Sequence, residues 1–305
     1  MSLDASNLFN SSKGNFDFIP KSLLNTLSLS HTSSGVLCKW NSIIDGDTYY
    51  FKSGSLNDFG YFVNRQPQAE LMAYRIGVQL GIPNLVETKI ATAMFPLTDD
   101  YEEQEALVSY TKDFLPSALD SYVGICKYFS DLELRKNIGN LYELFVNKFP
   151  FIEQDLVVMV LFDFIILNVD RHLNNFGLIE KVGKPLCLNP IFDNGLSLLA
   201  NLSDDELLNI SDFYLDRKMK VKPFKSNPYT QLGTVDLNKI PSNVRDSILN
   251  CTLDWSKIFD GLDLKDLRKS KIKSLVEGRL SYVKSLLLKM VWWNCWSNYL
   301  SRMYF

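Results

Sequence analysis

The sequence predicts an α+β fold of two lobes: a small β-rich N-terminal lobe with one main helix, and a larger, mostly helical C-terminal lobe. Strand patterns and a single helix pattern occupy residues 31–115, whereas helix patterns dominate residues 116–305. Of the 305 residues 46% are hydrophobic, so the chain can bury a core large enough for two lobes. Residues 1–30 are rich in Ser and Asn, and we expect them to form a loosely held N-terminal arm.

Composition narrows the possible functions. The formal net charge of −3 and the pI near 5.5 supply no broad positive field, so we expect no direct binding of nucleic acid. The five cysteines are scattered and never spaced as C-x-x-C, which favours a reducing cytoplasm over a disulfide framework or a structural zinc site. No apolar run reaches the roughly 18 residues of a transmembrane segment. Only His31 and His172 are present, so the residue types favour carboxylate chemistry.

The N-terminal lobe is expected to begin with an antiparallel hairpin. Strand-like segments at Gly35–Trp40 and Thr48–Lys52 flank a turn signal, Asp45-Gly46-Asp47. A loop follows at Gly54–Gly60, where Gly, Asn and Asp are frequent. The hairpin places Lys52 on a strand. Lys39, on the neighbouring strand, is the other lysine that could serve in its place.

A helix is predicted over Gln68–Leu80, because apolar residues recur there at helical spacing and Gly81-Ile82-Pro83 ends the pattern. Strand-like runs at Val86–Phe95 and Ala106–Tyr110 complete this lobe. The chain is then expected to cross to the second lobe near Phe114-Leu115-Pro116.

The firmest element of the C-terminal lobe is a helix over Phe151–Asn168, which is apolar almost all round and should therefore be buried. A short hairpin is expected next, from Phe176–Glu180 to Pro185–Leu188, and it would return Asp193 to the neighbourhood of Asp170. Helices separated by polar loops are expected from residue 204 to residue 288.

Two segments carry the chemistry. Asn168–Gly177 reads NVDRHLNNFG, and Pro190–Gly195 reads PIFDNG. Asp170 could accept the proton of an attacking hydroxyl, while Asn175 and Asp193 offer the hard oxygen ligands that Mg²⁺ prefers. These residue types, in this order, indicate a phosphotransferase.

Lys52 and Glu70 add a second indication. A lysine on a strand and a glutamate on the following helix are placed to form the ion pair that holds a lysine against nucleotide phosphates. Together with the order of strands and helices, the pair predicts a bilobal protein-kinase-like fold. A solvated lysine and a surface ion pair are the alternatives for these two residues.

At these residues the sequence resembles the HipA-like serine/threonine kinase family, a distant branch of the protein and phosphoinositide kinases. The resemblance implies ATP and Mg²⁺ as cofactors, Asp170 as catalytic aspartate, and Asn175 and Asp193 as magnesium ligands. It also implies Lys52 as the phosphate-binding lysine and Glu70 as its partner. The segments that carry it are Asp163–Gly177 and Pro190–Ser197, with support from Phe51-Lys52, Ala69–Pro83, Tyr110–Leu115 and Lys222-Pro223-Phe224.

Further roles follow from the same resemblance. Adenine is expected to meet backbone groups of the crossing segment, and His172 is expected to shape the catalytic loop. Arg171 would support the activation segment or neutralise phosphate charge. A buried carboxylate needs a partner, so we expect Asp163 to anchor the loop and not to react. The crossing segment comprises Ser109, Tyr110, Thr111, Lys112, Asp113 and Phe114.

The resemblance implies a cytoplasmic protein of bacterial or phage type that phosphorylates a protein, for which an aminoacyl-tRNA synthetase or another translation factor is one candidate. The resemblance also implies that the protein acts as the toxin of a toxin–antitoxin pair. Fuller family members carry an additional N-terminal subdomain, so we expect this chain to be a compact, kinase-only member. A separate small protein could then supply that subdomain or act as the antitoxin. The alternatives are a small-molecule or phosphoinositide-type kinase and a pseudokinase that binds nucleotide without transfer.

Two features have no settled assignment. No G-x-G-x-x-G motif precedes Lys52, so the phosphates would be clamped by another segment, for which Gly54–Gly60 and Ser33-Ser34-Gly35 are candidates. The tail, Lys289–Phe305, is rich in aromatic residues. We expect it to be helical and to pack on the C-terminal lobe, with self-association or contact with a partner or membrane surface as alternatives.

Overall fold

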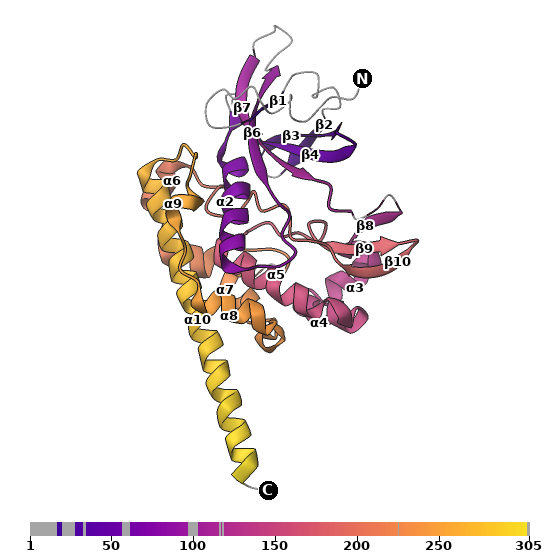
Figure 1. Cartoon of the computed structure of the whole chain (residues 1–305), viewed down its shortest axis with the longest axis vertical. Coiled ribbons are helices and arrows are strands. Elements are labelled where there is room, and N and C mark those ends of the chain that lie inside the picture. Colours follow the sequence, from indigo (N-terminus) through magenta and orange to yellow (C-terminus); the bar gives the residue numbers. More distant parts are fainter. Residues whose placement is uncertain are drawn as a thin grey trace.

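The computed structural model describes the backbone of residues 17–19, 28–32, 35–56, 62–96, 103–115, 117, 119–224 and 226–303. A β-sheet with one helix against it forms the N-terminal part, and a mostly helical arrangement forms the C-terminal part (Figure 1). The predicted α+β fold class is therefore confirmed.

The N-terminal sheet is built around the predicted hairpin. Its strand order is β1-β6-β7-β4-β3-β2, with β5 beside β4, and every pairing is antiparallel except that of β1 with β6. Asp45 and Gly46 make the turn between β3 and β4, both at positive φ. The strands are β1 (Asp17–Ile19), β2 (Ser28–Thr32), β3 (Gly35–Ile44), β4 (Asp47–Leu56), β5 (Phe62–Val63), β6 (Lys89–Pro96) and β7 (Glu103–Lys112).

Two sequence expectations differ from this sheet. Residues 17–19 and 28–30 belong to strands, whereas residues 1–30 are expected from the sequence to form a loosely held arm. Main-chain pairing at a sheet edge needs no apolar pattern, so the sequence gives no sign of it. Gly54 lies within β4 and not in a loop. A Cβ atom at Gly54 would lie 1.9 Å from the Val63 carbonyl oxygen, so glycine is required there for the close approach of β5.

Helix α2 (Arg65–Leu80) confirms the predicted helix and begins three residues earlier. Pro67 does not prevent this start, because the first turn of a helix needs no amide hydrogen at that position. The helix ends at Gly81, which has left-handed backbone angles. Arg75 joins α2 to the C-terminal part by donating hydrogen bonds to the carbonyl oxygens of Ile258 (3.0 Å) and Asp260 (2.7 Å).

Helix α5 (Glu153–Ile166) is the central element of the C-terminal part, and its residues from Leu156 to Ile166 are all buried. The predicted hairpin is also present, with β9 (Gly177–Lys181) paired to β10 (Lys184–Leu188) and β8 (Asp120–Gly124) on its other side. The remaining elements are η2 (Ile125–Tyr128), α3 (Asp131–Lys136), α4 (Leu141–Lys148), η3 (Pro150–Ile152), α6 (Asp204–Asn209), η4 (Tyr214–Lys218), α7 (Pro228–Leu232), η5 (Leu237–Lys239), α8 (Ser242–Asn250), α9 (Trp255–Ile258) and α10 (Asp266–Met303).

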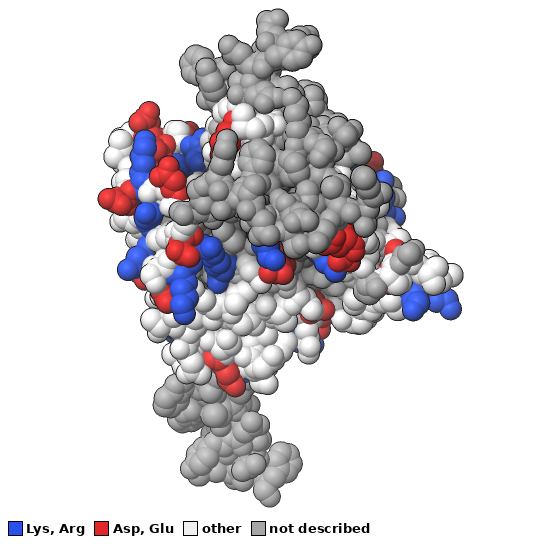
Figure 2. Space-filling view, turned by 45° about the horizontal axis from the view of Figure 1, so that its top comes forward, with Lys and Arg blue, Asp and Glu red and all other residues white. Residues whose placement is uncertain are grey.

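Helix α10 has 38 residues and extends beyond the other helices at its C-terminal end (Figure 1). The predicted packing of the aromatic tail concerns side chains after Met290, which lie outside the described residues. Within the residues that the structure describes, none of the helices is sufficiently long and apolar to span a membrane. On the face in Figure 2, acidic and basic side chains mingle along one flank.

Candidate active site

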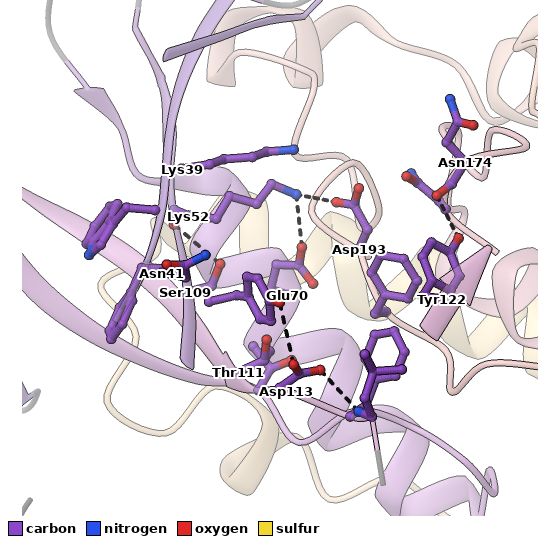
Figure 3. A pocket seen from close by; sticks show the side chains of 18 of the residues that line it. Lys39, Asn41, Lys52, Glu70, Ser109, Thr111, Asp113, Tyr122, Asn174 and Asp193 are labelled. Carbon is purple, nitrogen blue, oxygen red and sulfur yellow. Dashed lines mark hydrogen bonds and ion pairs between the residues drawn. The ribbon is translucent and has the colours of Figure 1, made fainter. Parts of the chain in front are cut away.

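A cavity of about 680 Å³ lies where the N-terminal sheet meets the C-terminal part. Strands β3, β4 and β7 and helix α2 line one side of it. The segments that follow α5 and β10 line the other, together with β8 (Figure 3). The lining residues are Lys39, Trp40, Asn41, Tyr50, Phe51, Lys52, Glu70, Thr88, Ser109, Thr111, Asp113, Phe114, Leu115, Tyr122, His172, Asn174, Asn175, Phe192 and Asp193.

Lys52 is the centre of an ion-pair network in this cavity. Its ammonium lies 3.2 Å from Glu70 Oε1 and contacts Asp193 Oδ1. The three side chains come from β4, α2 and the loop after β10, and Figure 3 shows them converging. The structure therefore brings together the lysine and the two carboxylates that the sequence selects.

The network fixes the charges of its members. Burial alone would lower the pKa of Lys52, but the nearby carboxylates of Asp193 and Glu70 outweigh burial and raise that pKa above its ordinary value. Burial would raise the pKa of Asp193, but the Lys52 and Lys39 ammonium groups lower it well below its usual range. Lys52 is therefore protonated and Asp193 ionised across the physiological pH range.

Glu70 also fixes the loop that carries Asp193. Its second carboxylate oxygen, Oε2, accepts a hydrogen bond of 2.9 Å from the backbone amide of Asn194. A Cβ atom at Gly195 would lie 3.2 Å from Glu70 Oε1 and 3.3 Å from Lys52 Nζ. Glycine at position 195 thus leaves room for the ion pair beside the loop.

The segment after α5 is held in place by a contact with Asp163 of that helix, which is the role expected for this carboxylate. Arg171 is fully buried and donates two hydrogen bonds to the Asp163 carboxylate, at 2.9 Å and 2.8 Å. It donates further hydrogen bonds to Asn194 Oδ1 (2.6 Å) and to the Phe192 carbonyl oxygen. Arg171 therefore holds the Asp193 loop, and its burial leaves it unavailable to neutralise a phosphate.

Asp170 lies beside the cavity but does not line it. Its carbonyl oxygen accepts a 3.0 Å hydrogen bond from Asn175 Nδ2, and its amide donates a 3.1 Å hydrogen bond to Asn168 Oδ1. These bonds order the loop between Asp170 and Asn175. His172 acts on the same loop, because its Nδ1 accepts a hydrogen bond from the Asn174 amide (3.2 Å).

Lys222 contacts Asp170, a contact that the sequence did not reveal. Its ammonium lies 2.5 Å from Asp170 Oδ1. The backbone amide of Lys222 donates to the Val169 carbonyl oxygen (3.2 Å), and Gln231 Nε2 donates to the Lys222 carbonyl oxygen (3.0 Å). The segment of Lys222 is thereby fixed against the loop between Asp170 and Asn175. The Lys222-Pro223-Phe224 motif and the basic residues from Arg217 to Lys222 were the sequence signals for this segment, and neither indicated a contact with Asp170.

The crossing segment contributes alternate residues to the cavity. Ser109, Thr111 and Asp113 line it, whereas Tyr110 is buried within the sheet core and Lys112 is exposed, 2.7 Å from Asp47 Oδ2. This alternation follows from the two-residue period of β7. The side chains of Tyr110 and Lys112 therefore do not reach the cavity.

Three aromatic side chains line the cavity together: Phe114, which belongs to the predicted crossing segment, and Tyr122 and Phe192, which the sequence did not single out. Phe114 and Phe192 have ring centroids 5.5 Å apart, and Tyr122 packs edge-on against both, at 5.9 Å and 5.8 Å. Burial raises the pKa of Tyr122, and its hydroxyl donates a hydrogen bond to the Asn174 carbonyl oxygen (2.8 Å). Aromatic rings grouped in this way can pack against a planar ring of a ligand.

Comparisons with known proteins agree with this architecture. The chain is similar to the crystal structure of a Helicobacter pylori proinflammatory kinase, CtkA, with a TM-score of 0.58 and 17% identity, over 95% of this chain and 99% of that chain. It is also similar to the structure of hydra Fam20 with sugar, with a TM-score of 0.50 and 12% identity, over 95% of each chain. The chain thus has a protein-kinase-like fold. No protein-family profile and no curated protein matches the sequence.

Proposed function

We propose that this protein is an ATP- and Mg²⁺-dependent phosphotransferase that transfers a γ-phosphoryl group to an alcohol, as a serine/threonine protein kinase of the HipA type. The observation that carries the proposal is the convergence of Lys52, Glu70 and Asp193 in one cavity, with Asp170 and Asn175 on the adjoining loop. We further propose that residues 31–115 and 116–305 form the two lobes of the kinase, with β1 and the start of β2 added to the sheet of the first lobe.

In this function Lys52 binds nucleotide phosphates and Glu70 holds it in place. Asn175 and Asp193 fit a magnesium ion, because both place hard oxygen-bearing side chains at the cavity and the Asp193 carboxylate is ionised. A metal ion held by these two residues would supply positive charge to offset that of the phosphates.

Asp170 orients the acceptor hydroxyl. Lys222 occupies its Oδ1, which leaves Oδ2 to accept the hydrogen bond of the attacking hydroxyl and, later, its proton. Phosphoryl transfer depends chiefly on positioning and charge neutralisation, so a firmly held carboxylate serves the reaction better than a strongly basic one.

Adenine would lie against β7 and the aromatic end of the cavity. Ser109, Thr111 and Asp113 line that side, and Phe114 and Phe192 offer ring faces and edges to a flat base. His172 would shape the loop below the phosphates.

The choice of acceptor rests on the sequence resemblance. We propose a serine or threonine hydroxyl of a protein, with a translation factor such as an aminoacyl-tRNA synthetase as a candidate substrate. A role as the toxin of a cytoplasmic toxin–antitoxin pair, with a small protein partner, belongs to the same proposal. The Asp-Arg-His-x-x-Asn motif also resembles that of phosphoinositide kinases. A lipid headgroup or a small molecule is therefore the competing acceptor.

The test combines nucleotide binding with transfer. Mg-ATP is expected to raise the melting temperature, because a ligand that binds only the folded state stabilises it. Radiolabelled ATP should then label a protein pool in preference to a lipid pool, and mass measurement should show added phosphate. Label in the lipid pool alone would favour the competing acceptor.

Asp170→Asn separates transfer from binding. We expect it to reduce the transfer rate by at least about a hundredfold while nucleotide affinity changes little, because Asp170 lies outside the cavity lining. Asp246→Asn, at an exposed position in α8, is the matched control. Transfer by Asp170→Asn at the wild-type rate would remove Asp170 from the mechanism.

A further inference from the structure

The side of α10 that packs on the C-terminal part is well defined up to Met290. Buried apolar residues recur along it at intervals of three or four, as expected for one side of a helix against a core. We call this the core side of α10. Its fully or largely buried apolar residues are Ile272, Val276, Leu280, Val283 and Leu287.

Beyond Met290 the apolar positions change sides. The helix continues without a break to Met303 and extends past the other helices (Figure 1). Nine residues make about two and a half helical turns, so the position of Trp292 is opposite that of Val283, and the position of Trp296 is opposite that of Leu287. The side of the helix that these two tryptophans share also includes Trp293, Tyr299, Leu300 and Met303. We call it the aromatic face.

The aromatic face is in register with the outside of α10. Eighteen residues make about five full turns, which places Trp296 in line with Gly278 and Leu300 in line with Tyr282, and both earlier residues are exposed. The positions in line with the core side are polar and uncharged: Asn294, Ser297, Asn298 and Ser301. Residues 291–303 therefore form an amphipathic helix whose apolar positions are turned half a revolution from those that pack on the core.

The charges of this part of the chain indicate what the aromatic face binds. After Glu277 the sequence contains four basic residues and no acidic one. Arg279 is paired with Asp216, and Lys284 donates to the Cys251 carbonyl oxygen, so these two are engaged within the fold. Lys289 and Arg302 lie at the two ends of the projecting segment, and Lys289 is exposed. An anionic partner would complement them.

The residue types narrow that partner further. Three of the five tryptophans in the chain lie between residues 292 and 296. Trp and Tyr favour the boundary between lipid and water, because each ring has an apolar body and a polar group. Basic side chains beside them can reach the phosphates of anionic lipids while their aliphatic parts stay in the apolar layer.

A second copy of the chain fits this face less well than lipid does. Lys289 occupies a register position on the aromatic face, between those of Trp292 and Trp293 around the helix. Two copies joined in parallel through this face would place one lysine against the other, and like charges in a helix seam are unfavourable. A layer of anionic headgroups accepts the same lysine without that cost.

We propose that residues 291–303 bind the surface of a membrane that contains anionic lipids, with the helix parallel to the bilayer and its aromatic face in the boundary between headgroups and acyl chains. Binding of this kind needs an amphipathic helix and no membrane-spanning segment. The inference goes beyond phosphoryl transfer and does not depend on it. It gives the protein a means of attaching to a membrane through an element remote from the cavity.

The test measures partition of the full chain onto sedimentable vesicles of phosphatidylcholine, with and without added phosphatidylglycerol. Trp292→Ser/Trp296→Ser alters the aromatic face, and Asn294→Ala/Asn298→Ala on the opposite side is its matched control. Lys289→Glu reverses the exposed charge, with Lys273→Glu, at an exposed lysine off the aromatic face, as its control. Circular dichroism establishes that each variant folds, and light scattering after gel filtration establishes the number of copies in solution.

We expect the wild-type protein to prefer the anionic vesicles by at least about fivefold, and its tryptophan emission to shift to shorter wavelength when it binds. Trp292→Ser/Trp296→Ser should lower the partition coefficient by about tenfold or more, and Lys289→Glu by about fivefold or more. Both controls should stay within about twofold of wild type.

Three results would overturn the proposal: no binding of wild-type protein to either kind of vesicle, equal binding to both kinds, or wild-type binding by the folded Trp292→Ser/Trp296→Ser variant. Should that variant not fold, wild-type binding by Lys289→Glu would overturn it instead. A dimer in solution that the tryptophan substitutions dissociate, without vesicle binding, would assign the aromatic face to a second copy of the chain. None of these results changes the proposed phosphoryl transfer, which is assayed without vesicles.

Discussion

Lys222 gives Asp170 a cationic partner from a distant segment. The contact uses Asp170 Oδ1, and both side chains remain partly exposed, at 44% for Lys222 and 25% for Asp170. Exposed ion pairs contribute little to stability, so the value of this contact lies in orientation. A carboxylate held by one oxygen presents the other in a constant direction.

Lys222→Met should therefore lower kcat and leave the KM for ATP nearly unchanged. We expect a fall in kcat of about ten- to a hundredfold, the effect of one charge-assisted hydrogen bond at the reacting group. Steady-state kinetics at several ATP concentrations measure kcat and the KM for ATP separately. Lys218→Met, at an exposed lysine in the same segment, is the control, and a wild-type kcat for Lys222→Met would show that Asp170 needs no such support.

The Lys52–Asp193 pair predicts a pH dependence of stability. The folded-state pKa of Asp193 is depressed, so its charge stabilises the fold above the unfolded-state pKa of about 3.9 and that stability is lost as pH falls through the folded value. The pKa of Lys52 is raised, so its contribution is complete below about pH 10.4 and is lost as pH rises further.

Asp193→Asn should cost about 3 kcal/mol of unfolding free energy at pH 7, because it leaves a largely buried ammonium with one carboxylate fewer. Urea denaturation at pH 7 and pH 3 would show the difference from wild type narrowing at the lower pH. A difference of equal size at both pH values would mean that the charge of Asp193 is not its source.

Helix α5 positions both halves of the candidate site through its C-terminal end. The helix is buried along most of its length and ends at Leu167, which has left-handed backbone angles. Asp163 near this end binds Arg171 of the following loop, and Arg171 in turn binds Phe192 and Asn194 on both sides of Asp193. One buried ion pair thus fixes two loops to one rigid helix.

Arg171→Met should destabilise the protein by about 3–5 kcal/mol, because it leaves the Asp163 carboxylate buried without its countercharge. Chemical denaturation measures the loss, with Arg135→Met at an exposed position of α3 as control. The double variant Arg171→Met/Asp163→Leu should recover part of the loss. A cost below about 1 kcal/mol for Arg171→Met would contradict a buried, paired arginine.

The molecule as a whole is tied together by buried or half-buried arginines that reach between distant elements. Arg75 joins α2 to the end of α9 and the residues after it, and Arg268 binds the Leu199 and Leu202 carbonyl oxygens. Arg279 on α10 donates to the Phe164 carbonyl oxygen of α5 (3.0 Å) and to Asp216 Oδ1 (2.8 Å). The C-terminal helix thereby supports the helix that carries the site.

Arg279→Met should lower the unfolding free energy by about 2–4 kcal/mol, since it removes hydrogen bonds to a buried carbonyl and a carboxylate. The affinity of the folded protein for Mg-ATP should not change, because Arg279 does not line the cavity. Lys273→Met, at an exposed position of the same helix, is the control for denaturation. A large loss of nucleotide affinity would show that α10 also shapes the cavity.

Local patterns predicted much of this architecture. The β3–β4 hairpin, helix α2, helix α5 and the β9–β10 hairpin were each specified by periodicity and turn residues within a short segment. The parallel pairing of β1 with β6 was not predicted, because its backbone bonds leave no pattern in the side chains. The Tyr122 and Phe192 rings were likewise missed, since aromatic residues are common in cores.

The sequence by itself determined which chemical groups the protein has and their order along the chain: a strand lysine, a helix glutamate and the Asp170, Asn175 and Asp193 loops. Only the tertiary structure decided that Lys52 meets Asp193 and that Asp170 meets Lys222. Lys52 and Asp193 are 141 residues apart, and Asp170 and Lys222 are 52 apart. Such contacts depend on how buried elements pack against one another, and packing is a property of the assembled core that no single segment contains.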